Sequence, residues 1–263
     1  MEILVCVRRV PDTSENEIQL NSAGNDIERD DLVYSVNEPD NYAVEEALQI
    51  AARDGGKVTV VTVGSDEDEE VLRREMAMGA NQGVLISDDA FNGSDGRGIA
   101  TILKAFVQKG HYDLVLTGIQ AEDGGAQVGG MLAALLDYPF ASLVNAIAVL
   151  GGGKLKISRE IEGGNREMNE IDLPCVLSIQ TGINEPRYVG MRGIRQVASV
   201  PIPTFDSSKL GIDPTVVGAG AARVNRVDYF LPTLGKGAQI LHGTREENVD
   251  KVLELLAAKG GLK

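Results

Sequence analysis

The sequence predicts an α/β protein with a doubly wound, mainly parallel sheet that carries helices on both faces. Two observations in the first half of the chain lead to this fold class. Short apolar runs typical of buried parallel strands recur at intervals. Segments with the apolar spacing of amphipathic helices separate these runs, and such alternation is typical of a parallel sheet that is covered on both sides.

Four strands and four helices are expected before Pro139. The strands are residues 3–7, 57–63, 84–87 and 113–117. The first helix follows Asp40, has its apolar positions at Val44, Ala47, Leu48 and Ala51, and ends at Gly55-Gly56. Ser65 caps the second helix. The third is marked by the apolar residues Ile99, Leu103, Phe106 and Val107, and the fourth spans residues 128–136. The acidic run 66–69 complements the positive end of a helix dipole, so it indicates a solvated helix start rather than a metal site.

The pattern changes after Pro139. Residues 142–149, 155–161 and 175–180 read as strands joined by glycine turns, and we expect them to add antiparallel strands to the sheet. Residues 183–240 lose periodicity and contain several prolines, and a loop of that length is rarely idle. The predicted organisation is an α/β domain over 1–182, an extended arm over 183–240 that packs on another subunit, and a C-terminal helix within 241–263.

Composition excludes several classes of function. The net charge of −14 disfavours nucleic acid as a partner, because an acidic chain repels the phosphate backbone. Cys6 and Cys175 lie in apolar runs without a C-x-x-C motif, and His111 and His242 are far apart, so no metal site is expected. No apolar run approaches the roughly 18 residues of a membrane span. The chain also begins with a strand, so we expect a cytoplasmic protein without direct membrane insertion.

The candidate site lies where strands of the predicted sheet end, because ligands of open α/β sheets bind beyond the carboxyl ends of the strands. The Gly-rich loop (residues 118–130) leads from a strand into a helix whose first N–H groups are free to bind an anion. A plain Gly-rich turn is the alternative interpretation. A Rossmann G-x-G-x-x-G after a strand, a Walker loop and the G-x-S-x-G of hydrolases are all absent from the sequence.

Six stretches of sequence, in order and at matching spacing, together resemble one family. They are residues 5–12 (VCVRRVPD), 35–40 with 43–48 (SVNEPD, AVEEAL), 77–81 (AMGAN), the Gly-rich loop, 159–164 with Leu173-Pro174 (REIEGG, LP), and 184–188 (NEPRY). The chain is similar to electron transfer flavoprotein beta subunits (the ETF beta or FixA family). The resemblance implies a Rossmann-like fold of the adenine nucleotide alpha hydrolase type.

The resemblance also implies a function. Members of the family pair with an alpha subunit whose mobile domain carries most of the FAD, and the beta subunit helps to hold that FAD and binds a structural AMP. The FAD accepts electrons from an acyl-CoA or amine-type dehydrogenase and delivers them to a quinone reductase or similar acceptor. The chain is therefore expected to be an electron carrier subunit and not an enzyme by itself.

The family's site residues carry over onto matching positions. Those expected to line the adenosine pocket are Cys6, Asn37, Pro39, Asp40 and Val63. Those expected around the ribose and phosphate are Gly118, Gln120, Asp123, Gly125, Ala126, Gln127 and Val128, in a loop that is one residue shorter than the family norm. Partner recognition falls to Arg187, Tyr188 and Met191, and contact with the flavin domain to Glu160. The alternatives are core packing for Cys6, Val63 and Met191, and an exposed strand carboxylate for Glu160.

Two other functions stay open. A bifurcating beta subunit would bind a second FAD in place of AMP. Residues 87–91 (SDDAF) and the A-Q-V-G of the Gly-rich loop favour that branch, whereas residues 184–188 favour the AMP branch. A stand-alone nucleotide-binding stress-type domain would share the α/β core, but it would have no use for the arm after Ile183.

Overall fold

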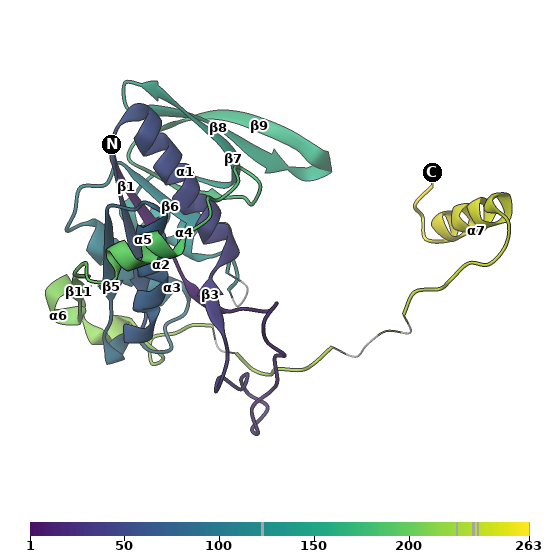
Figure 1. Cartoon of the computed structure of the whole chain (residues 1–263), viewed down its shortest axis with the longest axis horizontal. Helices are drawn as coiled ribbons and strands as arrows, with labels where there is room; N and C mark the ends of the chain where they lie inside the picture. Colours follow the sequence, from purple (N-terminus) through teal and green to yellow (C-terminus); the bar gives the residue numbers. More distant parts are fainter. Residues whose placement is uncertain (122–123, 225, 233–234, 236, 263) are drawn as a thin grey trace.

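A computed structural model describes residues 1–121, 124–224, 226–232, 235 and 237–262. Its centre is a nine-stranded sheet with the strand order β11-β5-β4-β1-β6-β10-β7-β8-β9 (Figure 1). The strands of this sheet are β1 (Glu2–Cys6), β4 (Lys57–Val63), β5 (Gln82–Ile86), β6 (Leu114–Gly118), β7 (Phe140–Gly151), β8 (Lys154–Ile161), β9 (Asn165–Asp172), β10 (Cys175–Ile179) and β11 (Thr204–Phe205). A separate antiparallel pair is formed by β2 (Arg9–Pro11) and β3 (Tyr34–Val36).

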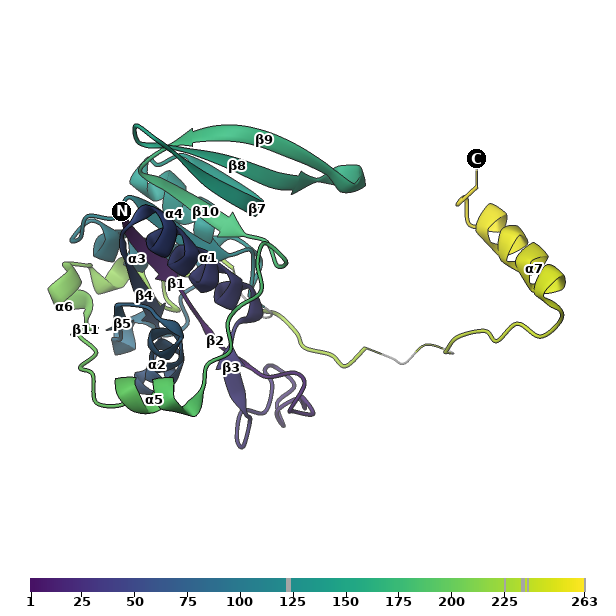
Figure 2. The ribbon, with the colours of Figure 1, turned by 45° about the horizontal axis from the view of Figure 1, so that its top comes forward.

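Helices cover both faces of the parallel part of the sheet (Figure 2). They are α1 (Glu38–Asp54), α2 (Glu69–Met78), α3 (Gly96–Val107) and α4 (Val128–Leu136). The helices α5 (Met191–Val197), α6 (Ser207–Leu210) and α7 (Arg245–Ala258) follow later in the chain. The apolar side chains fall into two cores, one under α1 and α2 and one under α3 and α4. Alternation along a strand divides neighbours between these cores: Leu4 belongs to the second core and Val5 to the first. The predicted doubly wound, Rossmann-like fold is confirmed.

The order of the strands reverses direction beside β1. The chain passes from β1 to β4 and β5 on one side, and then crosses to place β6 on the other side of β1. This reversal is a topological switch point, and connections leave the two neighbouring strands in opposite directions there. In open α/β sheets a ligand crevice is expected at such a point, outside the carboxyl ends of β1 and β6.

The second half of the sheet differs from the sequence prediction. Strand β10 was expected to be antiparallel, but it pairs in parallel with both β6 and β7. All five of its residues are buried, which is typical of a central parallel strand. The antiparallel extension consists of β7, β8 and β9. The sequence analysis missed β9, because its mostly exposed, polar side chains hide the alternation of a strand.

Two further boundaries differ from expectation. Helix α1 begins at Glu38, so Asp40 lies inside its first turn instead of before it, while Gly55, with a φ of 79°, ends the helix as predicted. The chain between β1 and α1, for which no strand was expected, contains the β2–β3 pair. Ser65 does cap the next helical segment, in a capping box with Asp68.

The first part of the arm lies against the domain instead of projecting from it. Helix α5 packs on α2, and β11 adds a parallel edge strand beside β5. Leu210 and Val217 are buried in the second core. The proposed division of the chain after residues 182 and 240 stays a prediction.

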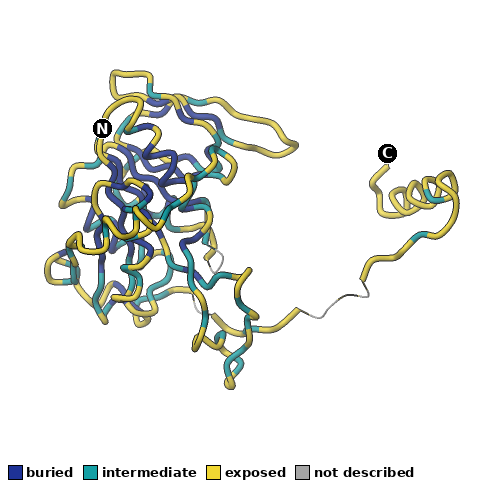
Figure 3. Tube along the Cα trace, in the orientation of Figure 1, coloured by how far each residue is buried: buried dark blue, intermediate teal, exposed yellow. Residues whose placement is uncertain are grey.

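The C-terminal helix α7 has no buried residue and lies apart from the sheet (Figure 3). Thr244 and Glu247 form a capping box at its start, so the local sequence determines where it begins. Its exposed apolar residues are Val249, Val252, Leu253, Leu255 and Leu256. Among the described helices, none combines the length and the apolarity needed to cross a membrane.

Helix α2 buries a carboxylic acid. Glu75 is fully buried, and within the described part of the chain neither of its carboxyl oxygens has a hydrogen-bond partner. Burial raises the pKa of Glu75 to about 8, and the charges of Asp40 and Glu45 act in the same direction, while Arg74 opposes them. Glu75 is therefore protonated in the folded protein at neutral pH.

We predict that Glu75 makes the protein less stable as the pH rises. The folded state holds this proton up to about pH 8, whereas the unfolded chain releases it near pH 4.3. The free energy of unfolding therefore falls as the pH rises between these values. Glu75→Gln should match the wild type at pH 4 and exceed its stability by about 1–3 kcal/mol at pH 8.5, as measured by urea denaturation.

The exposed Glu70 on the same helix provides the control. Glu70→Gln should change the free energy of unfolding by less than about 0.5 kcal/mol at either pH. A stability difference between Glu75→Gln and the wild type that does not depend on pH would contradict the buried-acid interpretation.

Candidate functional site

One carboxylate bridges the chain across the expected crevice, between the ends of β1 and β6. Asp40 Oδ2 accepts a hydrogen bond from the backbone N–H of Arg8 at 2.9 Å, and Asp40 Oδ1 accepts one from the N–H of Gly118 at 3.0 Å. Arg8 lies just after β1 and Gly118 ends β6. The first turn of α1 is therefore bound to the chain on both sides of the switch point.

Burial of Asp40 affects its ionisation. Burial raises the pKa of the carboxyl group to about 7, although hydrogen bonds from Asn37, Gly118 and Arg8 favour the anion. Gly118 has no room for a side chain, because a Cβ there would lie 2.4 Å from Asp40 Oδ1 and 2.7 Å from Pro39 Cβ. The close approach of β6 to α1 thus requires glycine at this position.

Asn37 makes a second connection across the crevice. It precedes α1, where an asparagine side chain usually caps the helix, but its side chain makes no cap bond here. Its Nδ2 instead donates to the carbonyl oxygen of Gln120 at 2.9 Å, and its backbone N–H donates to the carbonyl oxygen of Arg8 at 2.8 Å. Asn37 Oδ1 is buried and lacks a donor among the described residues.

Cys6 and Val63 lie at the carboxyl ends of β1 and β4. Both are half-buried and pack against the core under α3 and α4, so their role in core packing is part of the fold. Burial, with a smaller contribution from the charge of Asp40, raises the pKa of the Cys6 thiol to about 12. Cys6 is consequently an unreactive neutral thiol, and its contact with a ligand stays a prediction.

The Gly-rich loop lies beside this crevice. Residues 124–127 are exposed, and Ala126 adopts a left-handed conformation with a φ of 55°. Helix α4 begins at Val128, and Gln127, the residue before it, makes no side-chain cap bond. Among the described residues, no side chain accepts from the first N–H groups of this helix. Asp123, which the sequence analysis assigned to this loop, lies outside the described residues.

Gly129 determines how closely α4 approaches the sheet. The buried hydroxyl groups of Thr117 and Ser178 are 2.9 Å apart and form a hydrogen bond below this residue. A Cβ on Gly129 would lie 2.5 Å from Ser178 Oγ and 3.0 Å from Thr117 Oγ1. The sequence analysis missed this role, although the G-G pair within a helical pattern was the signal that could have revealed it.

Gln127 connects the Gly-rich loop to α3. A Cβ on Gly96, the first residue of α3, would lie 3.0 Å from Gln127 Oε1 and 3.2 Å from Gln127 Cβ. The sequence analysis did not include Gly96 or its neighbour Asp95, because the segment 92–96 lies far from the Gly-rich loop in the sequence.

The predicted partner-recognition residues lie elsewhere, beside α1 and α2. The guanidinium group of Arg187 forms a bidentate ion pair with Glu45, with Nε–Oε2 and Nη2–Oε1 distances of 2.7 and 2.9 Å. Tyr188 and Met191 follow, with exposed fractions of 92% and 63%. The ion pair therefore holds the segment to α1 while the two apolar side chains face solvent, and their role in recognition stays a prediction.

Glu160 lies on the antiparallel extension. It is an exposed residue of β8, and its Oε2 accepts a long hydrogen bond of 3.3 Å from Gln180 Nε2. The contact of Glu160 with a flavin domain stays a prediction.

The fold defines a doubly wound α/β protein whose candidate ligand site lies at the switch point of its sheet. The model of the electron transfer flavoprotein domain matches residues 25–210 of the chain. The chain therefore belongs to the electron transfer flavoprotein family, and its relatives place it among the beta subunits of that family.

Three relatives illustrate this. The electron transfer flavoprotein subunit beta of Methylophilus methylotrophus is 36% identical over 97% of this chain and 98% of its own length. The corresponding subunit of Thermoanaerobacterium thermosaccharolyticum is 34% identical over 98% and 99% of the two chains. The caffeyl-CoA reductase-Etf complex subunit CarD of Acetobacterium woodii is 34% identical over 95% of each chain.

We predict that Gly129 and its neighbour Gly130 respond in opposite ways to alanine. Gly129→Ala forces Cβ against Ser178 Oγ and should lower the free energy of unfolding by about 1–3 kcal/mol. A Cβ on Gly130 meets only the ring of Phe140, at 3.4 Å. Gly130→Ala should raise stability by about 0.5–1 kcal/mol through helix propensity. Urea denaturation of both variants tests this, and equal stability would show that α4 does not depend on its close approach to the sheet.

Proposed function

We propose that the chain is the beta subunit of a heterodimeric electron transfer flavoprotein, that it binds a structural AMP at the switch-point crevice, and that it helps to hold the FAD of an alpha subunit. In this function the chain is an electron carrier subunit rather than an enzyme. Two observations support the proposal: the buried acceptor Asn37 Oδ1 has no partner among the described residues, and Gln127 provides no side-chain cap for the start of α4 at the Gly-rich loop.

The chemistry of these groups suits AMP. Asn37 Oδ1 needs a donor, which an amino or hydroxyl group of adenosine supplies. The free N–H groups at the start of α4 favour a phosphate. The Gly-rich loop contains no Lys or Arg, so backbone groups have to provide most of the attraction for the anion. Pro39, Gly118 and Gln120 belong to the same crevice, and we propose contacts with the nucleotide for them and for Gly125, Ala126, Gln127 and Val128.

The redox chemistry belongs to FAD, which accepts and releases electrons when it is bound. The residues of this chain place and orient cofactors. The neutral Cys6 thiol, whose pKa burial raises to about 12, has no reactive role. We propose contact with the flavin domain for the exposed Glu160 on β8.

The second candidate is a bifurcating beta subunit that binds a second FAD in place of AMP. Residues 87–91 favour it, and one relative is named as a subunit of a caffeyl-CoA reductase-Etf complex. The motif over residues 184–188 favours AMP. We retain AMP as the first proposal.

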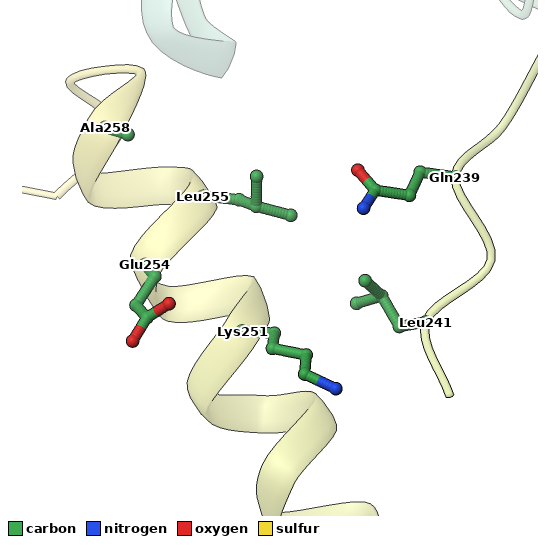
Figure 4. A pocket seen from close by; sticks show the side chains of 6 residues that line it. All are labelled: Gln239, Leu241, Lys251, Glu254, Leu255 and Ala258. Atoms are coloured by element: carbon green, nitrogen blue, oxygen red, sulfur yellow. The ribbon is translucent and has the colours of Figure 1, made fainter. Parts of the chain in front are cut away.

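The C-terminal part of the chain supports assembly with an alpha subunit. Within the described residues, the apolar side chains of α7 stay exposed. A hollow of about 370 Å³ separates α7 from residues 239–241, and Leu241 and Leu255 face each other across it (Figure 4). Such exposed apolar surface usually marks an interface. We propose that the later part of the arm and α7 pack on the alpha subunit in the cytoplasm.

For electron input we propose an acyl-CoA or amine-type dehydrogenase, and for output a quinone reductase or similar acceptor. The exposed Met191 at the start of α5 is the proposed apolar anchor for the dehydrogenase, with Tyr188 beside it. Arg187 contributes by holding the segment to Glu45.

We predict one flavin and one AMP per heterodimer. Denaturing the purified heterodimer and quantifying released nucleotides by chromatography should give this ratio, and the chain purified alone should carry no stoichiometric FAD. Two flavins without AMP would transfer the assignment to the bifurcating branch. A chain that binds nucleotide tightly and never co-purifies with an alpha subunit would support the stress-type domain instead.

We predict that Met191→Ala weakens coupling to the dehydrogenase without loss of cofactor. Truncation of an apolar anchor costs about 2 kcal/mol, or roughly a thirtyfold loss of affinity. The flavin reduction rate, measured against dehydrogenase concentration, should shift to higher concentrations by that factor, while the melting temperature stays unchanged. Met168→Ala is the control, because Met168 on β9 is similarly exposed, at 57%, and lies outside this segment. A lower melting temperature with an unchanged concentration dependence would assign Met191 to packing.

A further inference from the structure

The loop that follows β5 forms hydrogen bonds with residues 207–219 of the arm. Asp88 Oδ2 accepts bonds from the N–H and hydroxyl groups of Ser207, at 2.9 and 2.5 Å. Ser94 Oγ accepts a hydrogen bond from the N–H of Gly218 at 2.8 Å. The carbonyl oxygen of Asn92 accepts one from the N–H of Ala219 at 2.9 Å. These bonds join segments that are more than a hundred residues apart in the sequence.

Asp95 makes the last of these connections. Its Oδ1 accepts the N–H of Gly98 at 2.9 Å and thereby caps α3. Its Oδ2 accepts the N–H groups of Arg223 at 2.8 Å and Val224 at 3.3 Å. These hydrogen bonds hold the pKa of Asp95 below its ordinary value, the one from Gly98 being the largest cause. One carboxylate therefore serves both the helix start and the arm.

The same helix start contacts the Gly-rich loop. Gly96 follows Asp95, and the side chain of Gln127 lies so close to it that a Cβ there would be 3.0 Å from Gln127 Oε1. Helices α3 and α4 also pack along each other. A contiguous path thus runs from Gln127 through Gly96 and Asp95 to the backbone of residues 223–224.

We propose that Asp95 is a positioning residue that couples nucleotide binding at the Gly-rich loop to the direction in which the arm leaves the domain. The proposal rests on the function proposed above. A nucleotide that orders residues 124–128 holds Gln127 against Gly96 and thereby stabilises the capped start of α3. The Asp95 carboxylate, which accepts hydrogen bonds from Arg223 and Val224, is then held in place as well. By thermodynamic reciprocity, a partner that fixes the arm strengthens nucleotide binding.

The geometry gives this coupling a consequence for assembly. Everything after Val224, including the exposed apolar helix α7, begins at the point that Asp95 holds. Fixing the backbone there restricts where the rest of the arm can start, which lowers the entropic cost of docking it on a partner. The three N–H donors also compensate the charge of Asp95, so that the carboxylate is compatible with a phosphate at the neighbouring loop.

Hydrogen–deuterium exchange of the full chain, with and without AMP and in parallel with FAD, tests the coupling. In the wild type the bound nucleotide should slow exchange in residues 124–130, and it should slow exchange of the Arg223 and Val224 amides at least about fivefold. In Asp95→Ala those two amides should exchange faster without nucleotide and should no longer respond to it. Asp95→Asn, which keeps an acceptor for Gly98, replaces the alanine variant if that variant does not fold.

Asp213→Ala is the matched control. Asp213 also caps a short helix in the same region and accepts a hydrogen bond from the N–H of Thr215 at 2.9 Å, but no described bond joins it to α3 or to residues 218–224. It should leave the exchange of residues 223–224 unchanged.

Each outcome is decisive. Protection of residues 124–130 by nucleotide without any change at residues 223–224 would overturn the coupling. Unchanged exchange at residues 223–224 in the nucleotide-free Asp95 variant would overturn the role of Asp95 itself. If neither nucleotide protects residues 124–130, the proposed function fails and the coupling fails with it, and the nucleotide-free comparison still decides whether Asp95 holds the arm.

Discussion

The two hydrogen bonds accepted by the Asp40 carboxylate are the constraint on which the site depends. They join the start of α1 to Arg8 after β1 and to Gly118 at the end of β6, across the point where the strand order reverses. Because the carboxyl group is buried, loss of either bond leaves an unsatisfied polar group without access to water. The bond to Gly118 also requires a residue without a side chain at the end of β6. The crevice is therefore pre-organised by the fold.

A chain with a net charge of −14 exerts no general electrostatic attraction on an anion. The candidate site offers backbone groups and close packing instead. Gly129 allows α4 to approach the Thr117–Ser178 hydroxyl pair, and this approach brings the start of α4 to the strand ends. Asn37 Oδ1, which is buried and has no partner among the described residues, adds polarity without charge. Besides the Asp40 carboxylate, the geometry of the site therefore depends on the absence of a side chain at Gly118 and Gly129.

The arm shows how one segment serves both the domain and its assembly. Its first part contributes an edge strand and two buried apolar residues, Leu210 and Val217, to the domain. Farther along the arm, the N–H groups of residues 223–224 donate hydrogen bonds to Asp95, which lies at the start of α3 beside Gln127. Helix α7 exposes apolar side chains that the described part of the chain leaves uncovered. The segment around Asp95 therefore contacts both the Gly-rich loop and the arm.

The amino-acid sequence was sufficient to predict the fold class and most of the helices and strands. Hydrophobic periodicity, glycines at helix ends and N-cap residues are all local signals. The strand over residues 57–63 and the end of α1 at Gly55 needed no tertiary information. The tertiary structure alone decided that β10 lies centrally between β6 and β7, and that Asp40 reaches Gly118 and Asp95 reaches Arg223. These contacts join residues 78 and 128 positions apart. They depend on which strands become neighbours, and local periodicity carries no information about the order of strands in a sheet.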